Sequence, residues 1–487
     1  MGSEPEDRVK HADSYVVLED RLHGKPLENV RTFFIKPSTA TSRENEWLFP
    51  SKLDMMFVPF YTPILCTFTL TEHKFGSVER VVQHLKDSLA DALVPFYPLA
   101  GRVVSKDGPP RIHCNDAGAA FTEASVDVEL AVLRTDDFQP QPLLSGLTAA
   151  GLKDYPALPQ IDIGLPALII QVTHFKCGGI TLAANWAHVV ADGKSGLHFM
   201  KSWSELARGL QISLLPDHRR DLVKPRKVPV SNNPFKASTV SAGAQITPAK
   251  TMTEKLDELS TVKKTGEVRS VQEQPRIAAK TIEFSKDDIA KLKNEALDHD
   301  PNVQLSRADC LSTHLWRTFA RAKNLPSSSR VRLIYLVEGR TKLSLPPGYF
   351  GNVIGFKTII TTVDELLNGP FESTASLIHS AISSVTADWF QDLVDFMVFL
   401  QPGQNPFGAD EIGPACTFGV SYLIRFPFYE LDFGFGIPAH SMRNTMGARD
   451  GLVFVVPSSH GPDHMVAMAN FNPEVMTKFV SMAQDIP

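Results

Sequence analysis

Cysteine is scarce in this sequence of 487 residues: there are five, an odd number. No two of them have the C-x-x-C spacing, and they are scattered as Cys66, Cys114, Cys177, Cys310 and Cys416. This pattern argues against a disulfide framework and against a cysteine-based zinc site. We therefore expect a reducing, cytoplasmic location and no bound metal.

Long apolar runs and a targeting segment are also missing. The longest uncharged apolar stretch, residues 55–71, is interrupted by Pro59 and Pro63. It predicts a buried strand and a turn, and not a membrane span. The first fourteen residues are charged and lack an apolar core, so no secretory signal is expected. Glu6 also stands where a myristoylation signal needs Ser or Thr, and we expect no membrane partner.

A basic surplus is absent as well. The net charge is -5 at pH 7, which gives no reason to expect nucleic acid as a partner. The sequence also contains no G-x-S-x-G nucleophile elbow, so a serine acyl-enzyme is not predicted. What is present is a hydrophobic fraction of 43%, typical of a globular chain with a large core.

The length predicts two or three domains. Between residues 214 and 274 Pro, Ser, Lys, Thr and Glu dominate and aromatic residues nearly vanish, which predicts a mobile linker. We therefore divide the chain into an N-terminal domain (1–213), a crossover linker (214–274) and a C-terminal domain (275–487). This division leaves open that some of the C-terminal segment packs with the first domain.

Strand and helix patterns alternate along both halves. Helical spacing of apolar residues predicts helices over 77–93, 194–208 and 372–395. S-x-x-D capping signals at Ser285 and Ser306 predict two more helix starts. Apolar, β-rich runs predict strands at 168–175, 180–187 and 278–284, and further strands in the stretches 420–436, 451–457 and 465–471. The expected fold class is α/β.

The segment NWAHVVADGKSG carries the clearest chemistry. His188 follows an apolar strand, Asp192 comes four residues later, and Gly193 lets the backbone pass close to a neighbour. An imidazole titrates near neutrality and can accept a proton from an attacking alcohol or amine. Asp192 could orient that imidazole, or it could hold the loop by pairing with a distant arginine. By itself the pattern also fits a hydrogen-bonded core histidine.

Six motifs in the same order resemble the plant BAHD acyltransferase family over most of the chain. They are YPLAGRV at 97–103, FKCGGI at 175–180, HVVADG at 188–193, SRADCLSTHLWR at 306–317, EGRTKLSLPPGYFGN at 338–352 and LDFGFG at 431–436. The resemblance implies two similarly sized chloramphenicol-acetyltransferase-like domains with a solvent channel between them. It also implies a monomer that uses acyl-CoA as co-substrate and holds no tightly bound cofactor.

The resemblance assigns roles to individual residues. His188 matches the family's general base, Asp192 a structural loop-positioning residue, and Arg340 the arginine that pairs with it. In the LDFGFG motif, Asp432, Phe433, Gly434 and Gly436 are expected to be structural, as is Gly193 in the first motif. Phe435 replaces the usual tryptophan, so it keeps an aromatic filler but has no indole N–H donor. By resemblance, Asn352 lies nearer than Phe435 to the region expected for an oxyanion donor. Its expected role is nevertheless packing of a turn.

Three further observations concern specificity. Ala187 replaces the second histidine of peptide-synthetase condensation domains, which disfavours that relationship. Residues 399–422 contain no Arg or Lys, which argues against shikimate as the acceptor. Lys286, Lys291 and Lys293 could meet the phosphates of coenzyme A, but a solvated helix face is the favoured explanation, so no cofactor-binding residue is assigned.

The resemblance leaves three functions open. The first is transfer of a hydroxycinnamoyl or related aromatic acyl group to a hydroxyl acceptor. The second is transfer to an amine, such as a polyamine. The third is a non-catalytic family member that assists fatty-chain elongation, against which the retained His188, Asp192 and Gly193 argue.

Overall fold

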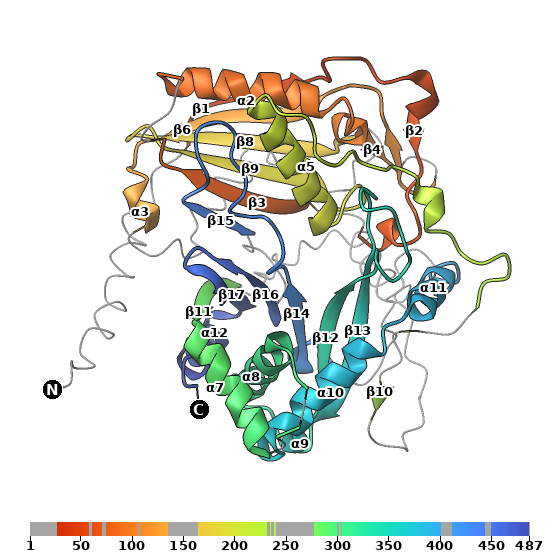
Figure 1. Cartoon of the computed structure of the whole chain (residues 1–487), viewed down its shortest axis with the longest axis vertical. Coiled ribbons are helices and arrows are strands. Elements are labelled where there is room, and N and C mark those ends of the chain that lie inside the picture. The colour runs from red at the N-terminus through yellow and green to blue at the C-terminus, as the bar shows by residue number, and fades with distance from the viewer. Residues whose placement is uncertain are drawn as a thin grey trace, which may run out of the picture. The chain divides into compact units, whose positions relative to one another are not determined.

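The structure of the protein is a computed structural model that describes most of the chain. The described residues are 27–57, 61–70, 75–105, 108–134, 164–230, 234, 238–239, 277–299, 301–302, 304–400, 412–443 and 450–486. They form two compact units (Figure 1). Unit 1 comprises Met1–Phe49, Pro59–Leu215 and Pro427–Met446, and unit 2 comprises Pro50–Val58, Pro216–Phe426 and Gly447–Pro487. The α/β class with two units is confirmed, and the channel between them stays a prediction.

Unit 1 is built on a six-stranded mixed sheet. Its strand order is β1 (Glu28–Ile35), β6 (Ala119–Val126), β8 (Leu168–Phe175), β9 (Ile180–Ala187), β3 (Tyr61–Phe68) and β15 (His440–Arg443). A smaller sheet has the order β2 (Trp47–Leu48), β5 (Arg111–His113), β4 (Arg102–Val104) and β7 (Leu165–Pro166). Its described α-helices are α2 (Val78–Ala92), α3 (Ala131–Arg134) and α5 (Gly193–Ala207).

The elements of unit 1 follow from local sequence signals. Ser77 caps α2, where its side chain accepts a hydrogen bond from the backbone N–H of Arg80. Helices α2 and α5 lie together on one side of the six-stranded sheet (Figure 1). The hairpin between β8 and β9 turns at Gly178, whose φ of +86° is a conformation that glycine adopts without strain.

Unit 2 contains a seven-stranded mixed sheet. Its order is β10 (Ser238–Thr239), β13 (Ile354–Thr362), β12 (Arg330–Glu338), β14 (Thr417–Tyr422), β16 (Leu452–Ser458), β17 (Gly461–Phe471) and β11 (Ala278–Phe284). The described α-helices are α7 (Lys286–His299), α8 (Arg307–Ala322), α9 (Val363–Asn368), α10 (Phe371–Ser383), α11 (Ala387–Phe396) and α12 (Pro473–Ala483). Both predicted capping signals form, with Ser285 and Ser306 each exchanging hydrogen bonds with the aspartate three residues later.

Two sequence predictions of secondary structure were wrong. The single helix expected over 372–395 is two helices, α10 and α11, because Thr386 starts a new helix by accepting a hydrogen bond from Trp389 N–H. The strand expected through 436 ends at Tyr422. Residues 431–436 form a loop, in which Gly434 and Gly436 take φ values of +93° and +99°, far from the negative φ of regular strand backbone.

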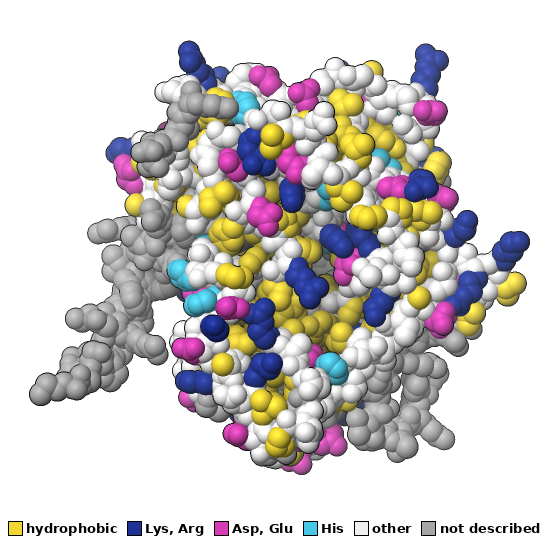
Figure 2. All heavy atoms as spheres, viewed as in Figure 1, with side chains coloured by type: hydrophobic (Ala, Val, Ile, Leu, Met, Phe, Trp, Pro, Cys, Tyr) yellow, Lys and Arg dark blue, Asp and Glu magenta, His cyan; other side chains and the backbone are white. Residues whose placement is uncertain are grey.

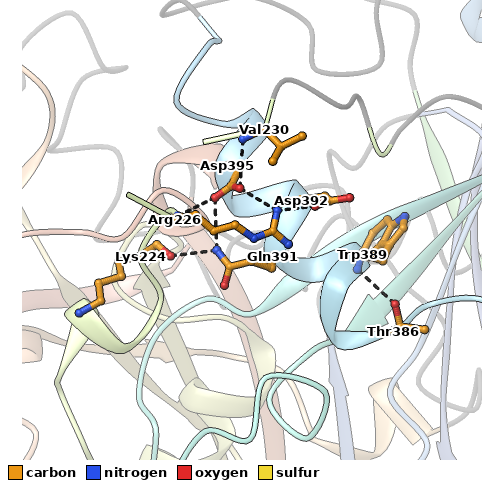
Figure 3. A network of polar contacts seen from close by, with 8 residues as sticks. All are labelled: Lys224, Arg226, Val230, Thr386, Trp389, Gln391, Asp392 and Asp395. Carbon is orange, nitrogen blue, oxygen red and sulfur yellow. Dashed lines mark hydrogen bonds and ion pairs between the residues drawn. The ribbon is translucent and has the colours of Figure 1, made fainter. Parts of the chain in front are cut away.

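The predicted domain boundaries also need correction. Residues 216–230, which were assigned to a mobile linker, belong to unit 2 and form polar contacts with α11 there (Figure 3). There Arg226 forms ion pairs with Asp392 at 2.7 Å and with Asp395 at 2.9 Å. The rest of the predicted linker lies mostly outside the described residues. Residues 427–446 pack with the first unit, as the division allowed for part of the C-terminal segment. Residues 50–58 pack with the second unit, which the division did not foresee.

The surface carries charges of both signs. On the face shown in Figure 2, acidic and basic side chains are interspersed over both units. Within the described ranges, no helix combines the length and apolar character needed to cross a membrane.

Candidate active site

His188 lies at a strand–turn–helix junction in unit 1. Strand β9 is buried along its whole length between β8 and β3, and it ends at Ala187. A turn follows, closed by a hydrogen bond from Val190 N–H to the carbonyl of Ala187 at 2.8 Å. His188 is the first residue of that turn and is buried, with 6% of its surface exposed. The position of the imidazole is therefore set by a core strand and not by a surface loop.

Asp192 ends the turn by capping α5. Its Oδ1 accepts a hydrogen bond from the backbone N–H of Ser195 at 2.9 Å. The side chain thus satisfies an N–H group that the first helical turn would leave without a partner. Asp192 is almost fully buried, so this bond is shielded from water. The observed contact is a structural one, which fixes where α5 begins after His188.

A close contact between α5 and β9 holds the same junction. Gly196, in the first turn of α5, lies directly against the indole of Trp186 in β9. A Cβ atom at this glycine would lie 2.0 Å from Cζ2 of Trp186, a distance that no side chain tolerates. The helix can approach the strand this closely only because residue 196 has no side chain. The two residues flank the turn that carries His188.

The DFGFG segment packs within unit 1 against α5 and β3. Oδ1 of Asp432 accepts hydrogen bonds from the backbone N–H groups of Gly434 (2.8 Å) and Gly436 (3.0 Å). The Phe433 ring meets the Trp203 ring of α5 edge to face at 4.9 Å between centroids. Phe435 meets Phe68 of β3 in the same way at 5.0 Å. Every contact named here is a packing or turn contact.

Arg340 lies in unit 2, in the loop between β12 and β13. It is buried, and it donates hydrogen bonds to the carbonyls of Tyr349 (3.1 Å) and Gly351 (2.7 Å). Its Nη1 also lies 2.9 Å from Oε1 of Glu338. The predicted pair with Asp192 would join the two units, whose relative placement the structure does not determine, so that pair stays a prediction.

Sequence reasoning missed two charged residues beside this loop, Asp54 and Arg220. Both are buried, and Nε of Arg220 lies 3.3 Å from Oδ2 of Asp54. Oδ1 of Asp54 accepts hydrogen bonds from the backbone and the side-chain amide of Asn352, at 2.7 and 2.8 Å. Burial and the nearby Asp54 carboxylate raise the pKa of Tyr349 above its usual range, so this phenol stays neutral. No spacing rule connects Asp54 with Arg220, because they come from segments far apart in the chain.

The remaining candidates are positioned as follows. The side-chain amide of Asn352 donates to Asp54, 298 positions away in the chain, so it joins its loop to a distant segment and does not only pack a local turn. Lys286, on α7, lies 4.0 Å from Asp463 as an exposed ion pair. Of the stretch that argued against shikimate, residues 401–411 lie outside the described residues. All five cysteines are free, and burial raises the pKa of Cys66 to about 12, which makes it a poor nucleophile.

Comparisons with known proteins agree with one another. The sequence profile of the Transferase family matches residues 25–486. Hydroxycinnamoyltransferase 1 of Oryza sativa subsp. japonica is 31% identical over 92% of this chain and 97% of its own length. Shikimate O-hydroxycinnamoyltransferase of Nicotiana tabacum is 29% identical over 94% of this chain and 99% of its own length.

Solved structures show the same fold. Vinorine synthase superimposes with a TM-score of 0.68 at 19% identity, covering 94% of this chain and 98% of its own. The TRI101 protein of F. sporotrichioides superimposes with a TM-score of 0.69 at 18% identity, covering 89% and 96%. These alignments extend across both units. With the six motifs in order and the profile matched over nearly the whole chain, the protein belongs to the Transferase family, the BAHD acyltransferases.

Proposed function

We propose that this protein transfers an acyl group from a coenzyme A thioester to a small-molecule acceptor, with His188 as the general base. The observation that carries the proposal is the position of His188 between a fully buried strand and a capped helix. A rigid mount of this kind suits a base that must meet a substrate in one orientation. Membership of the acyltransferase family supports the reaction type. The TRI101 protein was solved as a complex with coenzyme A, which supports that co-substrate.

The reaction runs through one tetrahedral intermediate. The imidazole of His188 accepts the proton of the acceptor hydroxyl through Nε2, and the oxygen attacks the thioester carbonyl carbon. The C–O bond forms as the carbonyl oxygen becomes an oxyanion. When the oxyanion collapses, the C–S bond breaks and the coenzyme A thiolate takes the proton back from His188. A positioned base of this kind accelerates a reaction by roughly 10²–10⁴-fold.

We propose a hydroxycinnamoyl or related aromatic acyl donor and a hydroxyl acceptor. The relatives from Oryza and Nicotiana are both hydroxycinnamoyltransferases and support the donor. The Nicotiana relative is named for O-acylation of shikimate. The lack of a basic residue in residues 399–422 is the reason to expect a different, uncharged alcohol here.

An amine acceptor is the second candidate. A relative from Avena sativa, 29% identical over 94% of this chain, is named as an N-hydroxycinnamoyltransferase that acts on 5-hydroxyanthranilate. It is as similar to this chain as the O-acylating relative from Nicotiana. Overall similarity therefore does not separate ester formation from amide formation, and the experiment below includes both.

Three further expectations belong to the proposal. Asp192 pairs with Arg340 and thereby fixes the loop of His188, while Gly193, Asp432, Phe433, Gly434 and Gly436 act structurally. The protein works as a cytoplasmic monomer. It needs no tightly bound cofactor, because the thioester itself supplies the activated acyl group.

The test is a matrix of acyl-CoA donors against alcohol and amine acceptors. Thiol release reports turnover, and the mass and alkali lability of each product separate esters from amides. We expect release with hydroxycinnamoyl-CoA and an uncharged aromatic or aliphatic alcohol. The variant His188→Ala should lose at least about 10²-fold in turnover while keeping the wild-type melting temperature.

The matched control is His379→Gln, since His379 is a half-exposed histidine that pairs with Asp309. This variant should retain full turnover. No thiol release from any donor would contradict acyl transfer, and full activity of His188→Ala would contradict the assigned base. Amide products alone would favour the second candidate.

A further inference from the structure

Strand pairing in unit 2 gathers two histidines and a glutamate that no motif connects. Glu283 lies in β11, His464 in β17, and His460 in the turn between β16 and β17. Antiparallel pairing sets Glu283 opposite Val466. Because side chains alternate along a strand, His464 points to the same face as Val466 and therefore as Glu283. The three side chains thus meet at one edge of the sheet.

The donor atoms of these three residues converge. Nδ1 of His460 lies 2.9 and 2.8 Å from the two carboxylate oxygens of Glu283. Nδ1 of His464 lies 3.3 Å from Oε1 of the same carboxylate. Among the described residues, this solvent-shielded nitrogen has no hydrogen-bond partner. One donor atom from each residue lies within 4.8 Å of the other two.

These distances suit a tetrahedral metal ion. Zinc binds imidazole nitrogen and carboxylate oxygen at about 2.0–2.2 Å, so two donors on one tetrahedral ion lie roughly 3.3 Å apart. The contact between His464 and Glu283 already has this length. The shorter contact between His460 and Glu283 is that of a hydrogen bond, which an ion would replace. His460 is exposed on the turn and can adjust without disturbing the core.

Neighbouring groups orient the carboxylate. The Ser458 hydroxyl donates a hydrogen bond to Oε1 of Glu283, and the His460 backbone N–H donates to the Ser458 hydroxyl oxygen at 2.9 Å. Partners of this kind hold a ligand in the rotamer that binding needs, and they are typical of metal sites. An ordinary surface ion pair does not require a second histidine aimed at the same oxygen.

We propose that Glu283, His460 and His464 bind one divalent transition-metal ion of the zinc class, with the fourth position left to water. The set of two imidazoles and one carboxylate favours Zn²⁺ over the hard ions Mg²⁺ and Ca²⁺, which prefer all-oxygen sites. The site lies in unit 2, whereas His188 lies in unit 1. We assign it no part in acyl transfer, and its ion would hold the β16–β17 turn against β11.

The experiment is calorimetric titration of Zn²⁺ into the full chain, from which any histidine tag has been removed. We expect one ion per chain, a higher melting temperature with Zn²⁺, and no comparable effect of Mg²⁺. His460→Ala and His464→Ala should each weaken binding by at least about tenfold. Co²⁺ in place of Zn²⁺ should give a visible absorption band that both variants lose.

The matched control is His113→Gln, since His113 also pairs with a glutamate, Glu46, at 3.4 Å but belongs to no group of three possible ligands in the described part of the chain. It should bind Zn²⁺ as the wild type does. The proposal is overturned if the wild type binds no Zn²⁺, if His460→Ala binds it unchanged, or if His113→Gln loses it. His460→Ala removes an exposed side chain, so a folding defect does not obscure the result.

Discussion

At the scale of single residues, four carboxylates, three of them buried and that of Asp432 partly buried, satisfy backbone N–H groups. Asp192 caps α5, Asp54 accepts from Asn352, and Asp432 accepts from two glycines of its own loop. Asp395 receives the backbone N–H groups of Arg226 and Val230 (Figure 3). Each acceptor fixes an irregular segment that would otherwise leave polar groups unpaired.

Variants of Asp192 can separate its capping role from the proposed ion pair. Asp192→Ala removes the cap, which by itself should lower the free energy of unfolding by about 0.5–2 kcal/mol, in addition to the loss of any ion pair. Asp192→Ser keeps an oxygen that can accept from Ser195 N–H but removes the charge. If the pair with Arg340 forms in a buried place, Asp192→Ser should still lose about 3–5 kcal/mol. Urea denaturation of the three proteins measures these differences.

The control is Thr386, which caps α11. Thr386→Ser should leave the free energy of unfolding unchanged, and Thr386→Ala should lower it by about 0.5–2 kcal/mol. A wild-type stability for Asp192→Ser would argue against the ion pair. A wild-type stability for Asp192→Ala would argue against both roles.

Asp395 should make the stability of unit 2 depend on pH. Burial by itself would raise the pKa of its carboxyl. The pKa is nevertheless below the ordinary value of 3.8, because the carboxylate accepts hydrogen bonds from the Arg226 and Val230 backbones and from Gln391, and because the Arg226 charge is near. A lowered pKa contributes stability that is fully present above the ordinary value and is lost as the pH falls through the folded value. Asp395→Asn should therefore be less stable than wild type at pH 7. This difference in stability should become smaller below about pH 3.8.

Thermal unfolding of both proteins from pH 7 down to pH 3 provides the measurement. Asp364→Asn is a suitable control, because Asp364 lies exposed in the first turn of α9. A constant difference between wild type and Asp395→Asn across the whole range would contradict the assignment.

At the scale of elements, the junction of β9 and α5 sets the place of His188. Its geometry depends on the indole of Trp186 lying against the backbone at Gly196. Asp192 caps the start of α5, and Phe433 packs on Trp203 further along the same helix. The loop around the histidine is therefore fixed by contacts on all its supporting elements in unit 1.

Gly196→Ala tests this junction. The added methyl group overlaps Trp186, so α5 has to move away from β9, at a cost of about 1–3 kcal/mol. Because the shift displaces the turn before α5, we expect acyl transfer to fall by more than the stability loss alone explains. Gly413→Ala is the matched control, since a Cβ there meets no atom within 4 Å and its φ of −67° suits alanine. Equal behaviour of both variants would contradict the close packing.

At the scale of the whole molecule, the chain crosses between the two units more than once. Residues 427–446 complete unit 1 although they follow most of unit 2 in sequence. Phe433 and Phe435 fill aromatic contacts there, and Ser441 lies 3.2 Å from the thiol of Cys66. The two units are therefore not two consecutive halves of the chain.

A fragment of residues 1–213, the N-terminal domain suggested by the linear division, should not fold by itself. It lacks β15 and the two buried phenylalanines, so it would expose the apolar faces of β3 and α5. We expect no cooperative unfolding transition by circular dichroism. Joining residues 427–446 to the fragment through a flexible linker should restore one. A cooperative transition of the bare fragment would contradict this division.

Local patterns in the sequence predicted many of the elements and the candidate base. Helix α2, strands β8, β9 and β11, and both Ser–Asp caps follow from signals within a few residues, where propensity and capping act. The prediction failed where backbone geometry decides, as in the break at Thr386 and in the loop of Gly434 and Gly436. Periodicity does not report a positive φ.

The sequence by itself determined the family, the α/β class and the identity of His188 as candidate base, because these depend on residue order and short spacing. Only the tertiary structure decided that Arg220 meets Asp54, that residues 427–446 belong to unit 1, and that Glu283 meets His460. Glu283 and His460 are 177 positions apart. Contacts at such separations arise from strand pairing and core packing. The local sequence around each residue does not predict them.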